Sequence, residues 1–417
     1  MSEIRTTVLD NRLTVVTQRL SGVQSVGLAW AMPGGTAREP GGREGLASIH
    51  ADLLLRGAAE RSSREQADAF DRLGVSRNAS AQAYTTTFRA SMLGARLEQA
   101  MPLITDTVLR PRLDPASLEP VRDLALQSIA SLRDDPQERV ILNLRRAHVA
   151  TPHNRSSYGT PEGVSSITPD DVEAAQRAWC VPDSSVLALA GDVEHNALLD
   201  LLGPLIAGWS GDAQHVEAIA PGVRGVTHEQ QDTDQTHIGV CYDGPTASDD
   251  AVWLERVATS VLSGGMSSRL FTEVREKRSL VYSVSARYGA DREYGRTTAY
   301  AGTTPERAQE TLTVMLGELE RIRTPAGAVT EEELGRALVG LKSRLVFSGE
   351  SSGARAIALA SDLRIHGRAR TLDEKAAEYD AVTLDRLNAY LARTDLGTIT
   401  VASVGKAPLD TPAGVSS

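Results

Sequence analysis

Apolar and polar residues recur along the chain with the two periods that distinguish strands from helices. Residues 12–18 and 25–32 have the strand pattern, and the short polar segment between them predicts a hairpin. The Pro-Gly-Gly sequence at 33–35 then ends the second arm. The chain is therefore expected to begin with β-structure.

Helical periodicity follows this hairpin. A strand of small and β-branched residues is expected at 80–91, between two pairs of helices. The helices are predicted at residues 45–56, 64–73, 97–108 and 115–132. Because strands and helices are mixed along the sequence, the pattern predicts an α+β fold.

The second half of the chain repeats the order of the first. A strand-like sequence ending at Gly191 precedes a similar one ending at Gly405 by 214 residues (405 − 191 = 214). Similar helix starts at Arg96 and Arg307 lie 211 residues apart (307 − 96 = 211). This offset is too long for a solenoid repeat, so we expect two similar domains. A chance similarity between common α/β elements is the alternative interpretation.

The domain boundaries follow from this repeat. Residues 209–229 combine glycine, proline and charge without a sustained apolar period, which is typical of a linker. We therefore expect an N-terminal domain at 1–208 and a C-terminal domain at 230–417.

Composition and charge exclude several classes of protein. The chain has 417 residues, 41% of them hydrophobic, so it can bury a sizeable core. No window approaches the roughly 18 apolar residues of a membrane span, and the N-terminus lacks a basic segment followed by an apolar one. The net charge of −10, with no run of basic residues, argues against nucleic-acid binding. We expect a soluble, cytoplasmic protein whose two cysteines, Cys180 and Cys241, are inert buried thiols.

One segment, residues 262–271, carries a distinctive motif. Its glycines permit a tight turn after a helix, and Ser267 or Ser268 could cap the next helix. A strand is expected at 280–288, with the following residues on one face: Tyr282, Val284, Ala286 and Tyr288. Taken alone, the segment predicts a capped helix that leads into a strand.

The sequence SGGMSSRLFTEVREKRSLVYSV, at 263–284, resembles the C-terminal-half signature of the insulinase/pitrilysin family of zinc metallopeptidases, which includes mitochondrial processing peptidase. Other fragments fall in the family's order: Pro-Gly-Gly at 33–35, Asp-Asp-Pro at 134–136, Tyr-Gly-Thr at 158–160 and Ala-Gly-Asp-Val at 190–193. The resemblance spans nearly the whole chain. It implies an α+β fold of two homologous domains, each a mixed, mainly antiparallel sheet covered by helices.

The family's zinc motif, His-x-x-Glu-His, is substituted in this sequence. The flanking residues place Ser48 and Asp52 at the two histidines and Ala51 at the glutamate base. The family's third ligand, a glutamate on a long helix before Asp-Asp-Pro, corresponds to Ser128. Serine hydroxyls are poor zinc ligands, and alanine cannot transfer a proton. The resemblance therefore implies no catalytic or metal-binding residue in this chain, and it argues against proteolysis by the chain alone.

His50 lies in the motif helix and could suggest a relocated metal site. His50 is two residues from Asp52, and helical positions i and i+2 point to different sides of a helix. We therefore expect His50 to form a hydrogen bond at the helix surface, and we expect His148 and His153, which nothing pairs as metal ligands, to be solvated or to cap a helix.

Arg275 and Tyr282 match an arginine and a tyrosine that the family spaces seven residues apart. The resemblance implies that they contact the substrate backbone and help to stabilise the oxyanion in active relatives. Both groups are strong hydrogen-bond donors, which suits such a role. The alternative is an ion pair between Arg275 and Glu273 or Glu276, with Tyr282 simply packing.

The leading hypothesis is a non-catalytic subunit of a heterodimeric zinc peptidase. The zinc is expected in a homologous partner subunit, and this chain would contribute Arg275 and Tyr282 to a chamber that binds peptide substrates. The alternatives are a structural or chaperone-like assembly protein and a homodimer that binds peptides without cleaving them. No nucleic acid or membrane is expected as a partner.

Overall fold

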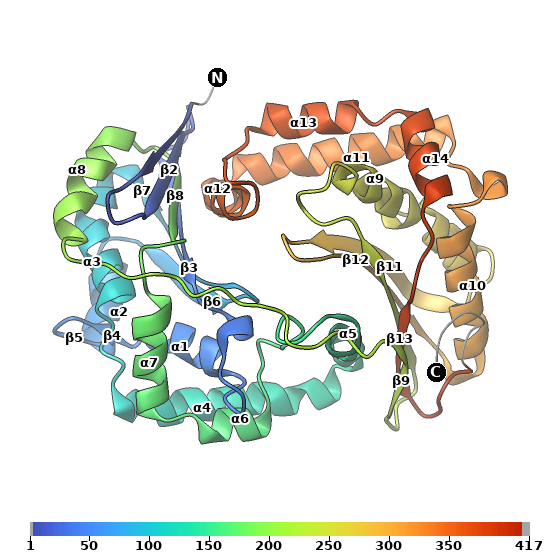
Figure 1. Cartoon of the computed structure of the whole chain (residues 1–417), viewed down its shortest axis with the longest axis horizontal. Helices are drawn as coiled ribbons and strands as arrows, with labels where there is room; N and C mark the ends of the chain where they lie inside the picture. Colours follow the sequence, from blue (N-terminus) through green and yellow to red (C-terminus); the bar gives the residue numbers. More distant parts are fainter. Residues whose placement is uncertain (1–2, 411–417) are drawn as a thin grey trace. The chain divides into compact units, whose positions relative to one another are not determined.

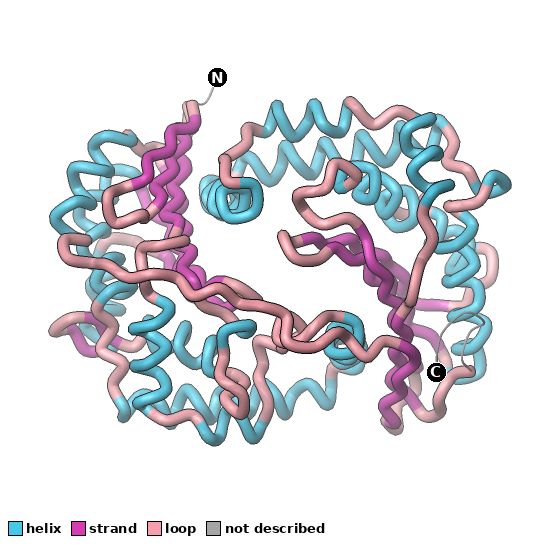
Figure 2. Tube along the Cα trace, in the orientation of Figure 1, coloured by secondary structure: helices cyan, strands magenta, loops and turns pink. Residues whose placement is uncertain are grey.

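The computed structural model describes residues 3–410, and its contacts divide the chain into two compact units. The first unit comprises the chain up to Ser131, Ala150–Ala220 and Ser348–Thr371. The second comprises Leu132–Val149, Pro221–Phe347 and the chain from Leu372 onward. Each unit contains a β-sheet with helices on both of its faces (Figures 1 and 2).

The first unit is built on a mixed six-stranded sheet. In sheet order its strands are β1 (Ile4–Val8), β2 (Thr14–Arg19), β8 (Val186–Gly191), β3 (Ser25–Pro33), β7 (Thr85–Leu93) and β6 (Ser76–Ala81). A two-stranded sheet joins β4 (Gly57–Ala58) to β5 (Arg61–Ser62). The helices of this unit are α1 (Leu46–Leu54), α2 (Ser63–Arg72), α3 (Leu97–Leu109), α4 (Pro115–Ser131), α6 (Pro161–Ser166), α7 (Pro169–Trp179), α8 (His195–Leu205) and α12 (Ser352–His366).

Strands β2 and β3 form no hairpin with each other, so that prediction is wrong. Strand β8 lies between them, parallel to β2 and antiparallel to β3. All six residues of β8 are buried, so this apolar strand is most stable at the centre of the sheet. The hairpin at the start of the chain is instead formed by β1 and β2. The prediction of a single strand at 80–91 is wrong as well. The chain turns between β6 and β7, which pair as a hairpin.

The two faces of this sheet bury different helices. On one face, Leu28 and Trp30 of β3 belong to a core cluster that includes residues of α3 and α8. On the other face, Ala29 and Ala31 pack with Leu359 of α12. The small side chains let α12 approach closely, and a Cβ added at Gly27 would clash with the backbone of Gly353.

The second unit is built on a five-stranded sheet. In sheet order its strands are β11 (Val281–Ala290), β12 (Gly295–Thr303), β10 (Thr236–Gly244), β13 (Thr400–Gly405) and β9 (Gly225–Gln230). Its helices are α5 (Pro136–His148), α9 (Val252–Ser263), α10 (Ala308–Arg321), α11 (Glu331–Glu350), α13 (Leu372–Asp380) and α14 (Leu384–Arg393). Leu312 of α10 and Leu387 of α14 are fully buried in one core cluster with Val240 of β10.

The two sheets have the same strand order, which confirms two homologous α+β domains. Read from β9, the second sheet runs β9-β13-β10-β12-β11 and matches β2-β8-β3-β7-β6 of the first. In both sheets the pair at the start of this order is parallel and the other pairs are antiparallel. The starts of β2 and β9 lie 211 residues apart (225 − 14 = 211), which agrees with the offset seen in the sequence.

Helices α5 and α12 occupy equivalent places on the two sheets, yet each comes from the opposite half of the chain. Helix α5 packs on β10 and β13 in the second unit, as α12 packs on β3 and β8 in the first. His148 anchors α5 because its ring nitrogens lie 2.9 Å from Thr400 Oγ1 and 3.0 Å from Asp243 Oδ1. His148 is 3% exposed and His153 is 4% exposed, so the solvated role expected for both is wrong.

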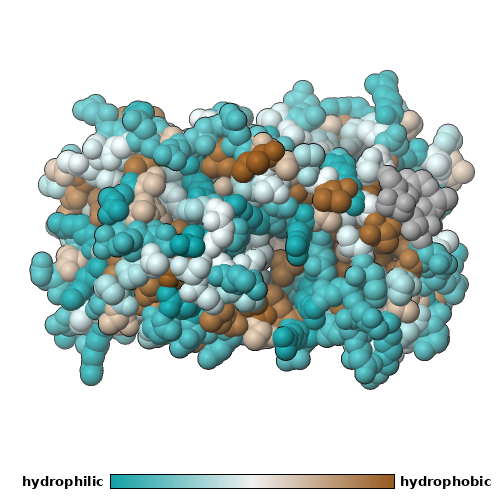
Figure 3. Space-filling view, turned by 60° about the horizontal axis from the view of Figure 1, so that its bottom comes forward, coloured by the Kyte–Doolittle hydropathy of each residue, from teal (hydrophilic) through white to brown (hydrophobic). Residues whose placement is uncertain are grey.

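One face of the molecule is drawn in Figure 3. Hydrophilic residues predominate on it, and hydrophobic residues lie in small groups among them. Among residues 3–410, no helix has the length and apolar character needed to cross a membrane.

Candidate functional site

The helix that aligns with the family's zinc motif is α1, in the first unit. Ala51 is 1% exposed and packs into the core. Ser48 is half-buried, and its hydroxyl donates a 2.6 Å hydrogen bond to the carbonyl oxygen of Ser157. Asp52 is exposed, and partial desolvation raises the pKa of its carboxyl while the charge of Arg56 opposes that shift. The carboxylate of Asp52 is therefore the only good metal donor of these three positions.

The fourth position of the motif adds no donor. Ser128 is exposed on α4, and its hydroxyl donates a 2.8 Å hydrogen bond to the carbonyl oxygen of Leu124 in the same helix. A catalytic zinc site needs three nitrogen, sulfur or carboxylate ligands, so one aspartate with two committed hydroxyls does not fit the metal. Across the described part of the chain, no group of three His, Cys, Asp or Glu residues is placed to hold a metal ion.

His50 is a core residue of α1, so its expected place at the helix surface is wrong. It is 1% exposed, and its Nε2 lies 2.7 Å from Gln176 Oε1. The ring also packs edge-on against Trp179, with centroids 5.5 Å apart. Burial lowers the pKa of His50 to about 4, so the ring is neutral near pH 7. The predicted hydrogen bond is present, but the ring faces α7 rather than solvent.

Glu39 fixes the start of α1, a role that no local sequence pattern predicts. Its Oε1 accepts hydrogen bonds from the backbone N–H groups of Gly45 (3.0 Å) and Ala47 (2.9 Å). Gly45 has a φ of 110°, which favours glycine at the entry to the helix. Glu39 is 4% exposed, and this burial raises the pKa of its carboxyl group to about 7. The other carboxyl oxygen, Oε2, is buried without a hydrogen-bond partner.

In the second unit, a buried arginine anchors the signature segment. Arg269 is 7% exposed, and its Nε and Nη2 donate two 2.7 Å hydrogen bonds to the carboxylate of Glu333 on α11. It also donates to the carbonyl oxygens of Gly327 and Ala328. Sequence reasoning missed this residue. The Ser-Ser-Arg sequence of the signature was visible, but its partner lies 64 residues away.

Arg275 lies on a π-helical turn, η4 (Phe271–Glu276), and its side chain is exposed. Its guanidinium carbon lies 4.9 Å from the centre of the Phe271 ring, a cation–π contact. Glu273, one of the two possible ion-pair partners, is instead bound to Lys277 at 2.7 Å and to Arg278 at 2.9 Å. Glu276, the other, forms no ion pair with Arg275 within residues 3–410. The guanidinium group of Arg275 is therefore held by an aromatic ring and keeps its donors available.

Tyr282 is 67% exposed, so it does not simply pack. The strand register shifts between Val281 and Ser283, which is a β-bulge at Tyr282. Beyond the bulge, Val284 and Ala286 point into the core as the alternation predicted. The bulge therefore turns Tyr282 away from the face that it was expected to share with them.

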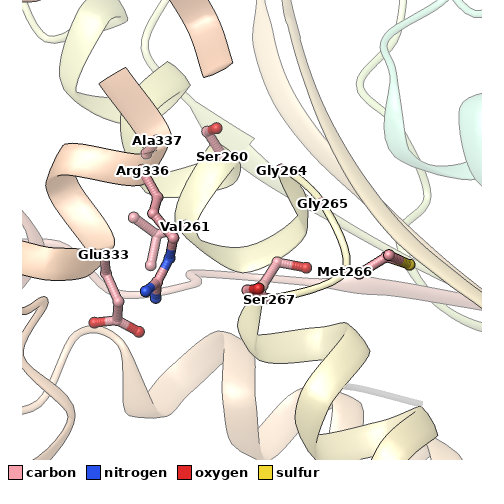
Figure 4. Close-up of a pocket in the computed structure, with 10 residues that line it drawn as sticks. Ser260, Val261, Gly264, Gly265, Met266, Ser267, Glu333, Arg336 and Ala337 are labelled. Carbon is pink, nitrogen blue, oxygen red and sulfur yellow. The ribbon is translucent and has the colours of Figure 1, made fainter. Parts of the chain in front are cut away.

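A small cavity adjoins the signature loop. Its volume is about 170 Å³, and it lies between the end of α9 and the first turns of α11 (Figure 4). Arg336, Ser260 and the loop from Gly264 to Ser268 contribute to its walls. Arg336 is paired with Glu332, and the carboxylate of Glu333 is occupied by Arg269, so the charges here are already neutralised within the unit.

The chain has a duplicated α+β fold, a substituted zinc motif and a retained second-half signature. Together these features indicate a relative of the zinc metallopeptidases. The family model "Insulinase (Peptidase family M16)" matches residues 14–161, and the model "Peptidase M16 inactive domain" matches residues 166–341. The chain belongs to this M16, or insulinase, family, as its sequence motifs indicated.

Known relatives resemble the chain over most of its length. A protein of Mycobacterium tuberculosis named an uncharacterized zinc protease is 29% identical to this chain, and the match covers 92% of this chain and 89% of that protein. A protein of Bacillus subtilis with a similar name is 27% identical, and the match covers 91% of this chain and 92% of that protein. A solved structure described as a peptidase M16 inactive domain from Pseudomonas fluorescens has a TM-score of 0.88 at 20% identity, covering 98% of this chain and 100% of its own. A protease structure from Helicobacter pylori has a TM-score of 0.86 at 18% identity, covering 97% and 100%. These structures share the fold.

Proposed function

We propose that this chain is the non-catalytic subunit of a two-subunit zinc peptidase. In this proposal a zinc-bearing homologue supplies the metal and the general base, and this chain supplies Arg275 and Tyr282 to the peptide. The observation that carries the proposal is that the chain has lost the zinc motif of its first half but keeps the signature of its second half. All four positions of the zinc motif are substituted, while the second-half signature is retained.

The local geometry of the two residues supports a binding role. The exposed guanidinium of Arg275 is held against Phe271, so it is oriented before a ligand arrives. The exposed phenol of Tyr282 stands at a bulge and is open to the same ligand. Preorganised donors of this kind stabilise developing negative charge because they need little reorganisation during the reaction. The relatives named zinc proteases make a peptide the natural substrate class.

A co-purification experiment followed by kinetics tests the proposal. The chain would be co-expressed with a homologue that carries His-x-x-Glu-His, and peptide hydrolysis by the purified pair would be measured. Arg275→Ala is expected to lower kcat by about 10²- to 10³-fold, as loss of an oxyanion donor does. Tyr282→Phe removes only the phenol hydroxyl and should act in the same direction. Arg278→Ala is the matched control, because this nearby exposed arginine is bound to Glu273.

Two other functions make different predictions. A structural or chaperone-like assembly protein predicts that neither substitution changes any peptidase activity. A homodimer that binds peptides predicts self-association and peptide affinity without a zinc-bearing partner. The cytoplasmic location expected from the sequence remains part of our proposal, and cell fractionation tests it.

A further inference from the structure

Four polar side chains form an array on one face of the first unit's sheet. Ser80 of β6 lies opposite Thr87 of β7, and Asn78 lies opposite Arg89. Opposite residues of an antiparallel pair, and residues two apart on one strand, share a face. Arg89 is also opposite Ala29 of β3, so this is the face on which α12 packs.

Arg89 has no partner in this array. It is half-buried, its Nε is buried without a hydrogen-bond partner, and no residue among 3–410 forms an ion pair or hydrogen bond with its guanidinium group. The hydroxyl of Ser80 is also buried and unpaired. By contrast, Arg370 in the same unit is paired with Asp362 at 3.0 Å. The array therefore presents unpaired donors and lacks a carboxylate to accept from them.

An unpaired donor that is shielded from water is costly, so a group that can accept from it binds with a net gain. The planar guanidinium fork matches a carboxylate, which can accept two parallel N–H bonds. The polar neighbours of Arg89 offer further donors to the same ligand, since serine and threonine carry hydroxyls and asparagine carries an amide NH₂. A peptide carboxylate meets these requirements better than a neutral or basic group does.

We propose that Arg89 and its polar neighbours on β6 and β7 bind a carboxylate of a peptide ligand. The proposal rests on the proposed peptide-binding function and adds a preference for acidic peptides. The carboxylate belongs either to an aspartate or glutamate side chain or to a peptide C-terminus. Arg89 is the residue that decides the preference, because it carries the only charge in the array.

The test uses three fluorescein-labelled peptides of the same length, with binding measured by fluorescence anisotropy on the full chain. The first contains glutamates and has an amidated C-terminus, the second has glutamine at each of those positions, and the third is the glutamine peptide with a free C-terminus. We expect either the first or the third peptide to bind about tenfold to hundredfold more tightly than the second, which is the range for a charged hydrogen bond. The stronger of the two identifies the source of the carboxylate.

Arg89→Met should abolish this preference, and Arg72→Met, a change at an exposed arginine of α2, should preserve it. Urea unfolding without peptide separates binding from folding. Because Arg89 has no partner, Arg89→Met should unfold at the same or a higher urea concentration than the wild type. A variant that unfolds earlier and loses all three peptides equally would show a structural role and overturn the proposal.

The remaining outcomes are also decisive. If the three peptides bind equally well to the wild type, the carboxylate site is wrong while peptide binding stands. If none of them binds, this inference fails together with the peptide-binding function. Only the carboxylate site would be refuted if two results occur together. The three peptides bind equally well, and peptide hydrolysis by the pair falls with Arg275→Ala but not with Arg89→Met.

Discussion

Glu39 and His50 make opposite contributions to the pH dependence of stability. The pKa of Glu39 is raised from 4.5 to about 7, so the folded chain binds a proton between these values that the unfolded chain has lost. The free energy of unfolding therefore falls as pH rises through this window, by up to about 3 kcal/mol for 2.5 pH units (7 − 4.5 = 2.5).

His50 has the opposite sign. Its pKa is lowered from 6.5 to about 4, so between these values the unfolded chain binds the extra proton. The free energy of unfolding consequently rises with pH, also by about 3 kcal/mol over 2.5 units (6.5 − 4 = 2.5). The two contributions largely offset each other in the wild type. Glu39→Gln should therefore reveal the rising contribution of His50.

The perturbation is measured by urea unfolding at several pH values between 4.5 and 7.5. In a Trp253→Phe background the remaining tryptophans, Trp30, Trp179 and Trp209, all lie in the first unit and report its unfolding. As pH rises across this range, the free energy of unfolding of Glu39→Gln should increase by about 3 kcal/mol relative to that of the background. Glu98→Gln, at an exposed position of α3, is the control and should run parallel to the background. Parallel curves for Glu39→Gln would refute the raised pKa of Glu39.

Two substitutions and one labelling experiment test the packing. Arg269→Met leaves the carboxylate of Glu333 without its buried partner and should cost about 3–5 kcal/mol in urea unfolding, whereas an unchanged midpoint would contradict the anchoring role. Gly27→Val places a side chain against the backbone of Gly353 and should lower the free energy of unfolding by at least about 1–3 kcal/mol. Amide exchange in α12 should become faster, and exchange at the wild-type rate would contradict the close approach. Cys180 should resist a thiol reagent in the folded chain because burial raises its pKa to about 12, and rapid labelling without urea would contradict its burial.

The four helices whose bounds were predicted match the structure well because each has a local signature. Helix α1 was expected at 45–56 and spans Leu46–Leu54, and α4 was expected at 115–132 and spans Pro115–Ser131. The order of the strands had no local signature. The insertion of β8 between β2 and β3 depends on a segment more than 150 residues further along the chain (186 − 33 = 153), so adjacency in sequence was misleading.

The exchange of α5 and α12 escaped prediction for a similar reason. The local sequence of each helix does not specify which sheet it covers, and distant contacts such as Gly27 with Gly353 and His148 with Thr400 place each helix on its sheet. Periodicity likewise gives the expected face of Tyr282 but not the bulge that redirects it. The substituted zinc motif, in contrast, could be read directly because its flanking residues fix the register.

The most direct test is the zinc content of the isolated, dialysed chain, measured together with its turnover of a peptide. Because Asp52 is the one good metal donor among the four motif positions, our account predicts far less than one zinc per chain and no turnover. One zinc per chain that disappears in Asp52→Ala, accompanied by peptide hydrolysis, would contradict it.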